Sequence, residues 1–244
     1  LTSGSNIYAS LSEGFKAGGY ATYECTEPYD PEEVTSLEFG YKGSLSENTS
    51  LNASLFRYDY TDFQVLQVVG IQTVTRNAGD ATVNGLELEA LSNLNDSLSM
   101  SYGLTLLDAT YGEFLNTNGL EPQLGQQQLE GKYLNNAPKV SVNLGLNYTT
   151  NLSSGSSLTY RANAVYKSKI YFSEFNEYSQ SAYTIVDLNL IWESADDRMR
   201  TRFYVKNATD EEYISGYLSS ATGGGRFGQW GYPRTAGIEI QRNF

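Results

Sequence analysis

The stretch PRTAGIEIQRNF, residues 233–244, ends the chain and decides the fold class. Side chains two residues apart lie on the same face of a β-strand. On one face of this stretch lie mainly apolar or aromatic residues, and on the other lie polar residues and glycine. The first face carries Ala236, Ile238, Ile240 and Phe244, with Arg242 as its exception, and the second carries Gly237, Glu239, Gln241 and Asn243. The pattern predicts a half-apolar strand that runs to the last residue, which is unusual because chain ends commonly fray.

The composition excludes one kind of membrane protein and leaves another open. Hydrophobic residues make up 40% of the 244 residues, yet the mean hydropathy is −0.41. No apolar run approaches the ~20 residues that a membrane-spanning helix needs. Barrel strands alternate in polarity and average out as polar, so a β-barrel remains possible. The 20 tyrosines, 23 glycines and only five prolines suit a protein rich in strands.

Charge and residue usage argue against several functions. The formal net charge of −12 disfavours nucleic-acid binding. The chain has no histidine, the commonest metal ligand and general base, and its single cysteine, Cys25, cannot form an intrachain disulfide or a zinc site. The glycines at 223–225 are not followed by the Lys-Ser/Thr of a phosphate-binding loop. We therefore expect no enzymatic activity, no metal and no cofactor.

Alternation with a period of two recurs along the whole chain. In SLSMSYGLTL, residues 97–106, Leu and Met face one way and Ser the other, which is typical of a half-buried strand. About ten such strands are predicted. They are Asn6–Phe15, Glu33–Leu45, Ser50–Val69, Thr73–Leu91, Ser97–Thr110, Lys139–Thr149, Ser157–Ile170, Tyr183–Glu193, Arg200–Lys206 and Arg234–Phe244.

The connections between these strands alternate in length. Short polar turns follow the even-numbered strands, whereas longer segments follow most odd-numbered ones, for example residues 111–138. Short turns at one rim and long loops at the other are typical of outer-membrane barrels. Two irregularities are expected: the apolar face is lost around Arg57 and Asp59, and a bulge is predicted at residues 77–79.

Alternation alone does not separate a membrane barrel from a soluble β-sandwich. Strand length, aromatic residues at strand ends and charges within the polar faces favour the barrel. The charges expected to line its lumen are Glu38, Lys42, Glu87, Glu89, Arg161 and Asp187, a role that we prefer to catalysis for the Glu87/Glu89 pair. The residues expected to contact lipid include Leu98, Met100, Tyr102, Val140, Val142, Leu144, Leu188 and Leu190. A soluble secreted β-sandwich that binds carbohydrate and a passive porin remain as alternatives.

Several segments resemble a known family. A terminal Phe244 on an alternating strand is similar to the C-terminal signal of bacterial outer-membrane barrels, which the barrel-assembly machinery reads. Six segments, in the family's order, resemble the barrel of TonB-dependent receptors. They are YASLSEGFKAGGY (8–20), YDPEEVTSLEFGYKGSL (29–45), RNAGDATVNGLELEA (76–90), NNAPKVSVNLGLNY (135–148), FYVKNATDEEY (203–213) and YPRTAGIEIQRNF (232–244).

The resemblance implies both a fold and a function. Receptors of this kind have about 22 antiparallel up-and-down strands around a plugged lumen. We therefore expect residues 1–244 to be the C-terminal part of the barrel, an open half-barrel of about ten strands, with the plug and the N-terminal strands outside this sequence. The whole receptor would lie in the bacterial outer membrane, in contact with its lipid, and import a scarce nutrient such as a siderophore, cobalamin or a saccharide. Its energy would come from TonB through the plug.

Ligand binding is expected on the long loops, because loops on a rigid scaffold commonly carry binding residues. Aromatic side chains beside amides and charges suit sugars, siderophores or other flat polar ligands. The candidate residues are Tyr20, Tyr23, Glu27, Tyr29, Tyr111, Glu113, Phe114, the glutamines at 126–128, Tyr171, Phe172, Glu174, Phe175, Tyr213, Tyr217, Arg226 and Trp230.

Overall fold

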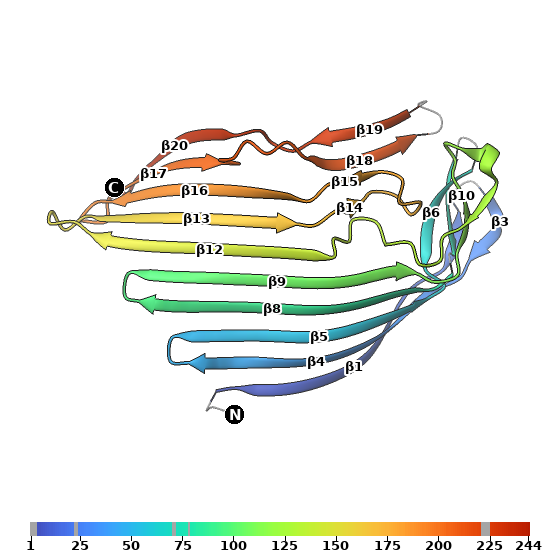
Figure 1. Ribbon diagram of the computed structural model, residues 1–244, viewed down its shortest axis with the longest axis horizontal. Helices are drawn as coiled ribbons and strands as arrows, with labels where there is room; N and C mark the ends of the chain where they lie inside the picture. The colour runs from blue at the N-terminus through green and yellow to red at the C-terminus, as the bar shows by residue number, and fades with distance from the viewer. Residues whose placement is uncertain (1–3, 22–23, 70–71, 78, 221–224) are drawn as a thin grey trace.

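A computed structural model describes residues 4–21, 24–69, 72–77, 79–220 and 225–244. Ten long strands form one antiparallel sheet in which every strand pairs with its neighbours in chain order (Figure 1). These strands are β1 (Asn6–Lys16), β4 (Glu32–Ser46), β5 (Thr49–Thr61), β8 (Ala81–Asn95), β9 (Leu98–Tyr111), β12 (Val140–Asn151), β13 (Ser157–Lys167), β16 (Tyr183–Glu193), β17 (Met199–Lys206) and β20 (Thr235–Arg242). The expected all-β, up-and-down architecture is confirmed.

The long connections are themselves built from short hairpins, which gather at one end of the sheet (Figure 1). A 3₁₀ turn at Pro122–Leu124 accompanies them. The hairpins are β2–β3 (Gly19–Ala21 and Glu24–Tyr29), β6–β7 (Gln64–Val69 and Gln72–Asn77), β10–β11 (Leu115–Thr117 and Gln126–Gln128), β14–β15 (Ile170–Tyr171 and Ser179–Gln180) and β18–β19 (Ile214–Ser220 and Gly225–Trp230). The predicted alternation of short turns and long loops is thus present.

Two of the predicted strands each cover two strands of the structure. The stretch predicted as one strand over residues 50–69 is β5 followed by β6, and that over residues 73–91 is β7 followed by β8. Asp62 breaks the first with a left-handed backbone, φ 52°, and the Phe63 N–H then donates to the carbonyl oxygen of Gly79. Ala78 lies outside the described residues, so the predicted bulge at 77–79 is not described.

The register of the sheet places the predicted polar and apolar residues on opposite faces. One row of directly paired residues reads Phe39, Leu55, Leu86, Leu106 and Val140 across β4, β5, β8, β9 and β12. A row of the other face reads Lys42, Asn52, Glu89, Gly103 and Asn143 across the same strands. We call these the apolar face and the polar face.

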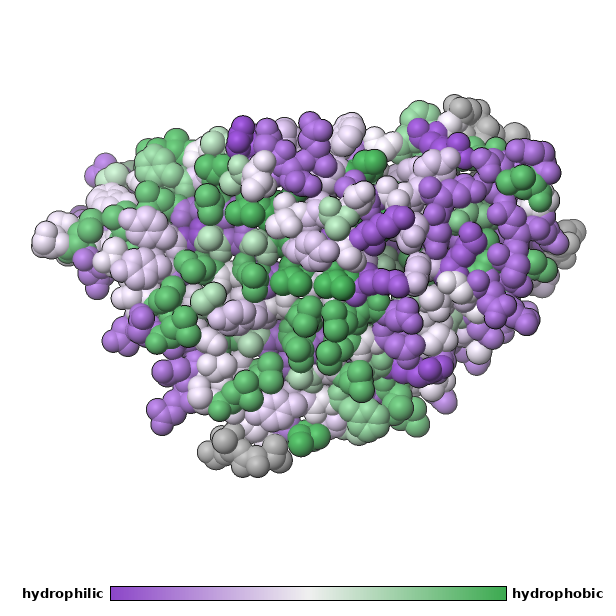
Figure 2. All heavy atoms as spheres, viewed as in Figure 1, coloured by the Kyte–Doolittle hydropathy of each residue, from purple (hydrophilic) through white to green (hydrophobic). Residues whose placement is uncertain are grey.

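The apolar face stops before the hairpin end of the strands. The row beyond Phe39 and Leu55 pairs Leu37 with Arg57, and Arg57 forms an ion pair of 2.7 Å with Asp59, which lies two residues further on the same face. Figure 2 shows hydrophobic residues over the middle of the strands and hydrophilic residues over the end that carries the hairpins. The predicted loss of the apolar face around Arg57 therefore marks where this face ends on the side of the hairpins.

The C-terminal strand is slightly shorter than predicted. β20 ends at Arg242, after which the Asn243 N–H donates to the carbonyl oxygen of Arg198. Phe244 is fully exposed, and the Arg242 guanidinium lies 5.3 Å from its ring centroid. Within the described residues β1 and β20 stand at the two ends of the sheet order and do not pair with each other. The sheet is therefore open, as expected for a half-barrel. Among the same residues no helix is long and apolar enough to cross a membrane.

Candidate ligand-binding loops

A small hydrophobic core holds two of the long loops together. Tyr111, Phe114, Leu129 and Phe175 are all buried, and Leu129 is completely inaccessible. The first three belong to the β9–β12 connection and its start, whereas Phe175 comes from the β13–β16 connection. The two connections therefore form one packed unit rather than separate flexible loops.

Polar contacts reinforce this packing. The amide of Asn116 donates to Glu174 Oε1 at 3.1 Å, and the Lys132 ammonium donates to the carbonyl oxygen of Phe175 at 2.8 Å. Burial raises the pKa of Glu174, with a smaller contribution from the nearby Glu177 carboxylate. A largely buried carboxyl is costly when ionised, and here the desolvation outweighs the hydrogen bond from its own backbone N–H. The protonation state of Glu174 therefore affects how firmly the loops dock.

Three connections meet at one arginine. Arg226 Nη2 lies 3.3 Å from Glu121 Oε1 and 4.0 Å from Glu177 Oε2, and its guanidinium lies 4.3 Å from the ring centroid of Tyr178. Tyr178 stacks on Tyr217 at 5.4 Å, and Tyr217 stacks on Phe172 at 5.7 Å, measured between ring centroids. We call Phe172, Glu177, Tyr178, Tyr217, Arg226 and Glu121 the arginine–aromatic cluster.

The chemistry of this cluster suits a ligand that is flat and carries oxygen atoms. The Arg226 side chain is 32% exposed, so a ligand oxygen could reach its guanidinium. Its ion-pair distances to the two carboxylates are longer than those of charge-assisted hydrogen bonds, about 2.7–2.9 Å. The stacked rings offer apolar surface and aromatic faces beside the charge. An anionic or strongly polar group could therefore compete with the carboxylates for Arg226.

The structure brings only some of the candidate residues together. Phe172, Tyr217 and Arg226 meet in the cluster. Tyr20 and Trp230 are exposed on the β2–β3 and β18–β19 hairpins, and Glu113 is exposed between β9 and β10. Tyr29 packs over Gly19, and Tyr213 stacks on Tyr183 at 4.7 Å. Tyr23 lies outside the described residues, as does the side chain of Glu27.

Other candidates support the loops rather than present a surface. Tyr111, Phe114 and Phe175 are buried in the small core, so direct ligand contact is not assigned to them. Gln128 Oε1 accepts the backbone N–H groups of Phe114, Leu129 and Glu130 and fixes that turn. Tyr171 stacks on Tyr133, away from the cluster.

Sequence reasoning missed half of the cluster. Tyr178 and Glu177 belong to the same connection as the candidates Phe172 and Glu174, so treating that aromatic segment as a whole would have included them. Glu121 gave no such signal, because it lies 105 residues from Arg226 in the chain. The Asn118 amide, which donates to Glu177 Oε2 at 3.0 Å, was missed for the same reason.

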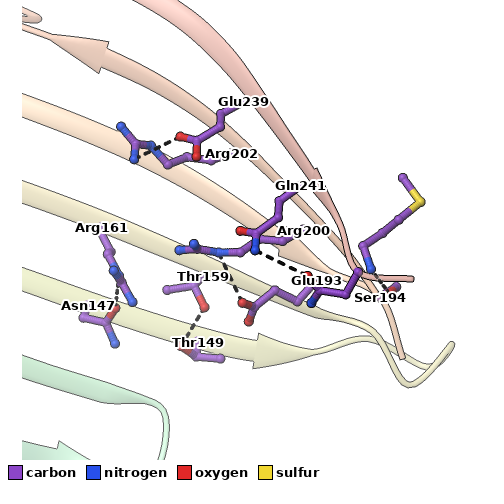
Figure 3. A network of polar contacts seen from close by, with 12 residues as sticks. Asn147, Thr149, Thr159, Arg161, Glu193, Ser194, Arg200, Arg202, Glu239 and Gln241 are labelled. Carbon is purple, nitrogen blue, oxygen red and sulfur yellow. Dashed lines mark hydrogen bonds and ion pairs between the residues drawn. The ribbon is translucent and has the colours of Figure 1, made fainter. Parts of the chain in front are cut away.

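The polar face carries its own network towards the rim with the short turns. Arg161 donates to Asn147, Arg200 lies 3.3 Å from Glu193, and Arg202 lies 3.3 Å from Glu239 (Figure 3). Each of these contacts joins neighbouring strands, so the arginines tie the strands to one another across the polar face.

The fold and loops described above are those of a TonB-dependent receptor barrel. The family model of the TonB-dependent receptor-like β-barrel matches residues 1–208, and the chain belongs to this family. Its members are outer-membrane proteins of Gram-negative bacteria. The single ten-stranded sheet and the family membership exclude the soluble β-sandwich.

Among curated relatives, the pesticin receptor of Yersinia pestis is 26% identical over 250 residues, which cover 100% of this chain and 34% of the relative. The ferrioxamine B receptor of Salmonella typhimurium is 23% identical over 212 residues, which cover 85% of this chain and 28% of the relative. The chain thus spans about a third of the length of these relatives.

Solved structures show the same fold. The ferric yersiniabactin uptake receptor from Yersinia pestis superposes with a TM-score of 0.81 at 24% identity, covering 100% of this chain and 36% of that chain. The siderophore receptor PiuA from Acinetobacter baumannii superposes with a TM-score of 0.77 at 22% identity, covering 98% and 34%. At this level of identity the likeness establishes the fold.

Proposed function

We propose that this chain forms part of an outer-membrane receptor that binds a ferric siderophore at its hairpin loops and imports it with energy supplied through TonB. The observation that carries the proposal is the arginine–aromatic cluster, where three connections converge on Arg226. The names of the relatives support a siderophore, and none of those given above points to cobalamin or a saccharide. TonB would act through a plug domain of the whole receptor, as in the family.

Within this proposal each member of the cluster has a role. Arg226 binds an anionic oxygen of the ligand, and Glu121 and Glu177 hold the guanidinium in place until the ligand arrives. Tyr178, Tyr217 and Phe172 stack beneath the ligand's flat groups. The buried core around Leu129 keeps two of the connections in register while the ligand binds.

The test uses the full-length receptor in a bacterial host that lacks its own siderophore receptors. Growth under iron limitation with a panel of purified ferric siderophores identifies the ligand, and binding to purified receptor gives its affinity. Arg226→Ala and Tyr217→Ala are each expected to weaken binding about tenfold, equivalent to ~1.4 kcal/mol.

Two matched variants serve as controls. Arg234 is an arginine outside the cluster, and it forms an ion pair of 3.5 Å with Asp210. Tyr232 is a tyrosine outside the cluster, and it is 87% exposed. Arg234→Ala and Tyr232→Ala should bind the siderophore as the wild type does. Wild-type affinity in both cluster variants would reject the site, and growth on no ferric siderophore would reject the proposed substrate class.

A further inference from the structure

Two lysines and two tyrosines form a continuous stack where β12 begins and β13 ends. The Lys139 ammonium lies 4.0 Å from the ring centroid of Tyr133 and donates to its hydroxyl at 2.5 Å, and the Lys169 ammonium lies 4.5 Å from the ring centroid of Tyr171. The two rings stack on each other at 5.9 Å with an interplanar angle of 11°. We call these four residues the lysine–tyrosine stack.

The register places this stack on the side of the apolar face. Tyr133 pairs with Thr110 in an isolated bridge. Thr110 lies four residues beyond Leu106 on β9, and side chains two and four residues apart share a face. The stack therefore lies just beyond the Leu106–Val140 row, where the apolar face gives way to polar residues.

The neighbouring residue confirms this orientation. Leu134 packs against the buried core of Tyr111, Phe114, Leu129 and Phe175, on the inner side of the loops. Consecutive residues of an extended segment point to opposite sides, so Tyr133 faces away from that core. The stack is thus separate from the arginine–aromatic cluster.

We propose that the lysine–tyrosine stack binds a phosphate group of a lipid headgroup in the outer leaflet. In a family of outer-membrane proteins, the level just beyond the apolar face is the headgroup region. Tyrosine prefers this interface, and lysine stems lie along apolar surface while their ammonium groups reach the headgroups. Both lysines are exposed, so their charges are available to an anion.

The charges of the stack favour an anionic partner. The Asp108 carboxylate, which lies on the same face, acts on Lys139. The two ammonium groups of the stack outnumber this carboxylate, so the stack keeps a positive charge in a chain whose net charge is −12. Each ammonium is held over a ring, which limits the rotamer freedom that binding would otherwise remove. The two ammonium groups are therefore held in place at the level of the lipid headgroups.

The experiment measures lipid binding by the full-length receptor purified in detergent. The probe is lipid A, titrated and followed by native mass spectrometry, beside the same lipid after removal of its phosphates. Wild-type receptor should bind the phosphorylated form and not the dephosphorylated one. Lys139→Gln/Lys169→Gln should weaken binding about tenfold or more, whereas Lys139→Arg/Lys169→Arg should retain it.

Matched lysines on the polar face provide the control. Lys42 lies 5.3 Å from the ring centroid of Tyr8, and Lys206 occupies the same face on β17. Lys42→Gln/Lys206→Gln removes the same charge and should leave lipid A binding unchanged. Equal binding by wild type and Lys139→Gln/Lys169→Gln would overturn the proposal, as would an equal loss in the control. Displacement of lipid A by millimolar inorganic phosphate would show that the stack takes free phosphate instead.

Discussion

Glu174 shows how a single buried carboxyl couples loop structure to pH. Burial raises its pKa, so the folded loops bind a proton more tightly than the unfolded chain does. The stabilisation from the protonated form is complete below the ordinary carboxyl pKa and is lost as the pH rises through the raised value. The docking of the β13–β16 connection onto Asn116 should therefore be firmest in acid.

We expect Glu174→Gln to remove this pH dependence, because glutamine still accepts from Asn116 but carries no charge to desolvate. In the full-length receptor, hydrogen-exchange protection of residues 172–178, corrected for intrinsic rates, should fall in the wild type as the pH rises from the ordinary carboxyl pKa through the raised pKa of Glu174. The variant should show constant protection. Glu113→Gln changes an exposed carboxyl and should follow the wild type; a pH-independent wild type would refute this role.

Phe244 is expected to matter for assembly into the outer membrane. The resemblance to outer-membrane assembly signals predicts that Phe244→Ala lowers the amount of full-length receptor in the outer membrane far more than Ile240→Ala does. Packing energy does not explain such a difference, because burying one aromatic contributes only roughly 2 kcal/mol. Quantitative immunoblotting of outer-membrane fractions measures it, and equal levels for wild type and Phe244→Ala would contradict the assignment.

At the scale of the element, the polar face uses glycine opposite aromatic rings. Tyr8 pairs with Gly40 and Phe56 pairs with Gly85, and in each pair the ring lies where a Cβ on the glycine would be, at 2.2 Å. Glycine therefore allows the ring to lie flat across the neighbouring strand. These pairs join β1 to β4 and β5 to β8.

Gly85→Ala should consequently strain the β5–β8 pairing, since overpacking typically costs about 1–3 kcal/mol. Gly103 is the matched control on the same face, because a Cβ there would meet only ordinary contact with Asn143 at 3.4 Å. We expect the full-length Gly85→Ala receptor to lose its folded, heat-modifiable band on gels at a lower temperature than Gly103→Ala. Identical transitions in the two variants would show that the ring moves aside at little cost.

The ten strands of the sheet were predictable because their alternation follows directly from a half-apolar face, as in residues 97–106. The breaks within the longer predicted strands were not, since nothing in the alternation marks the left-handed backbone at Asp62. The loop site was predictable only in part. Arg226, Tyr217 and Phe172 stood out as charged or aromatic loop residues, but the contact of Arg226 with Glu121 depends on tertiary packing between distant segments.

At the scale of the whole molecule, the described sheet has β1 and β20 as its two ends. In lipid each unsatisfied backbone group costs several kcal/mol, and unpaired edges promote aggregation. We therefore predict that residues 1–244 expressed alone aggregate and support no ligand uptake. The full-length receptor, by contrast, should fold and take up its ligand. A soluble monomer of this fragment without detergent would contradict the prediction.

We infer that the two faces of this sheet meet different environments, lipid on the apolar face and the lumen on the polar face. Val142 and Asn143 are adjacent on β12 and point to opposite faces, and they pair with Leu104 and Gly103 respectively. Spin labels placed singly at residues 142 and 143 of the full-length receptor in lipid bilayers test the claim most directly. We expect frequent collision with oxygen, a paramagnetic relaxation agent that dissolves in lipid, at residue 142 and infrequent collision at residue 143. Stronger collision at residue 143 would invert the faces and contradict the account.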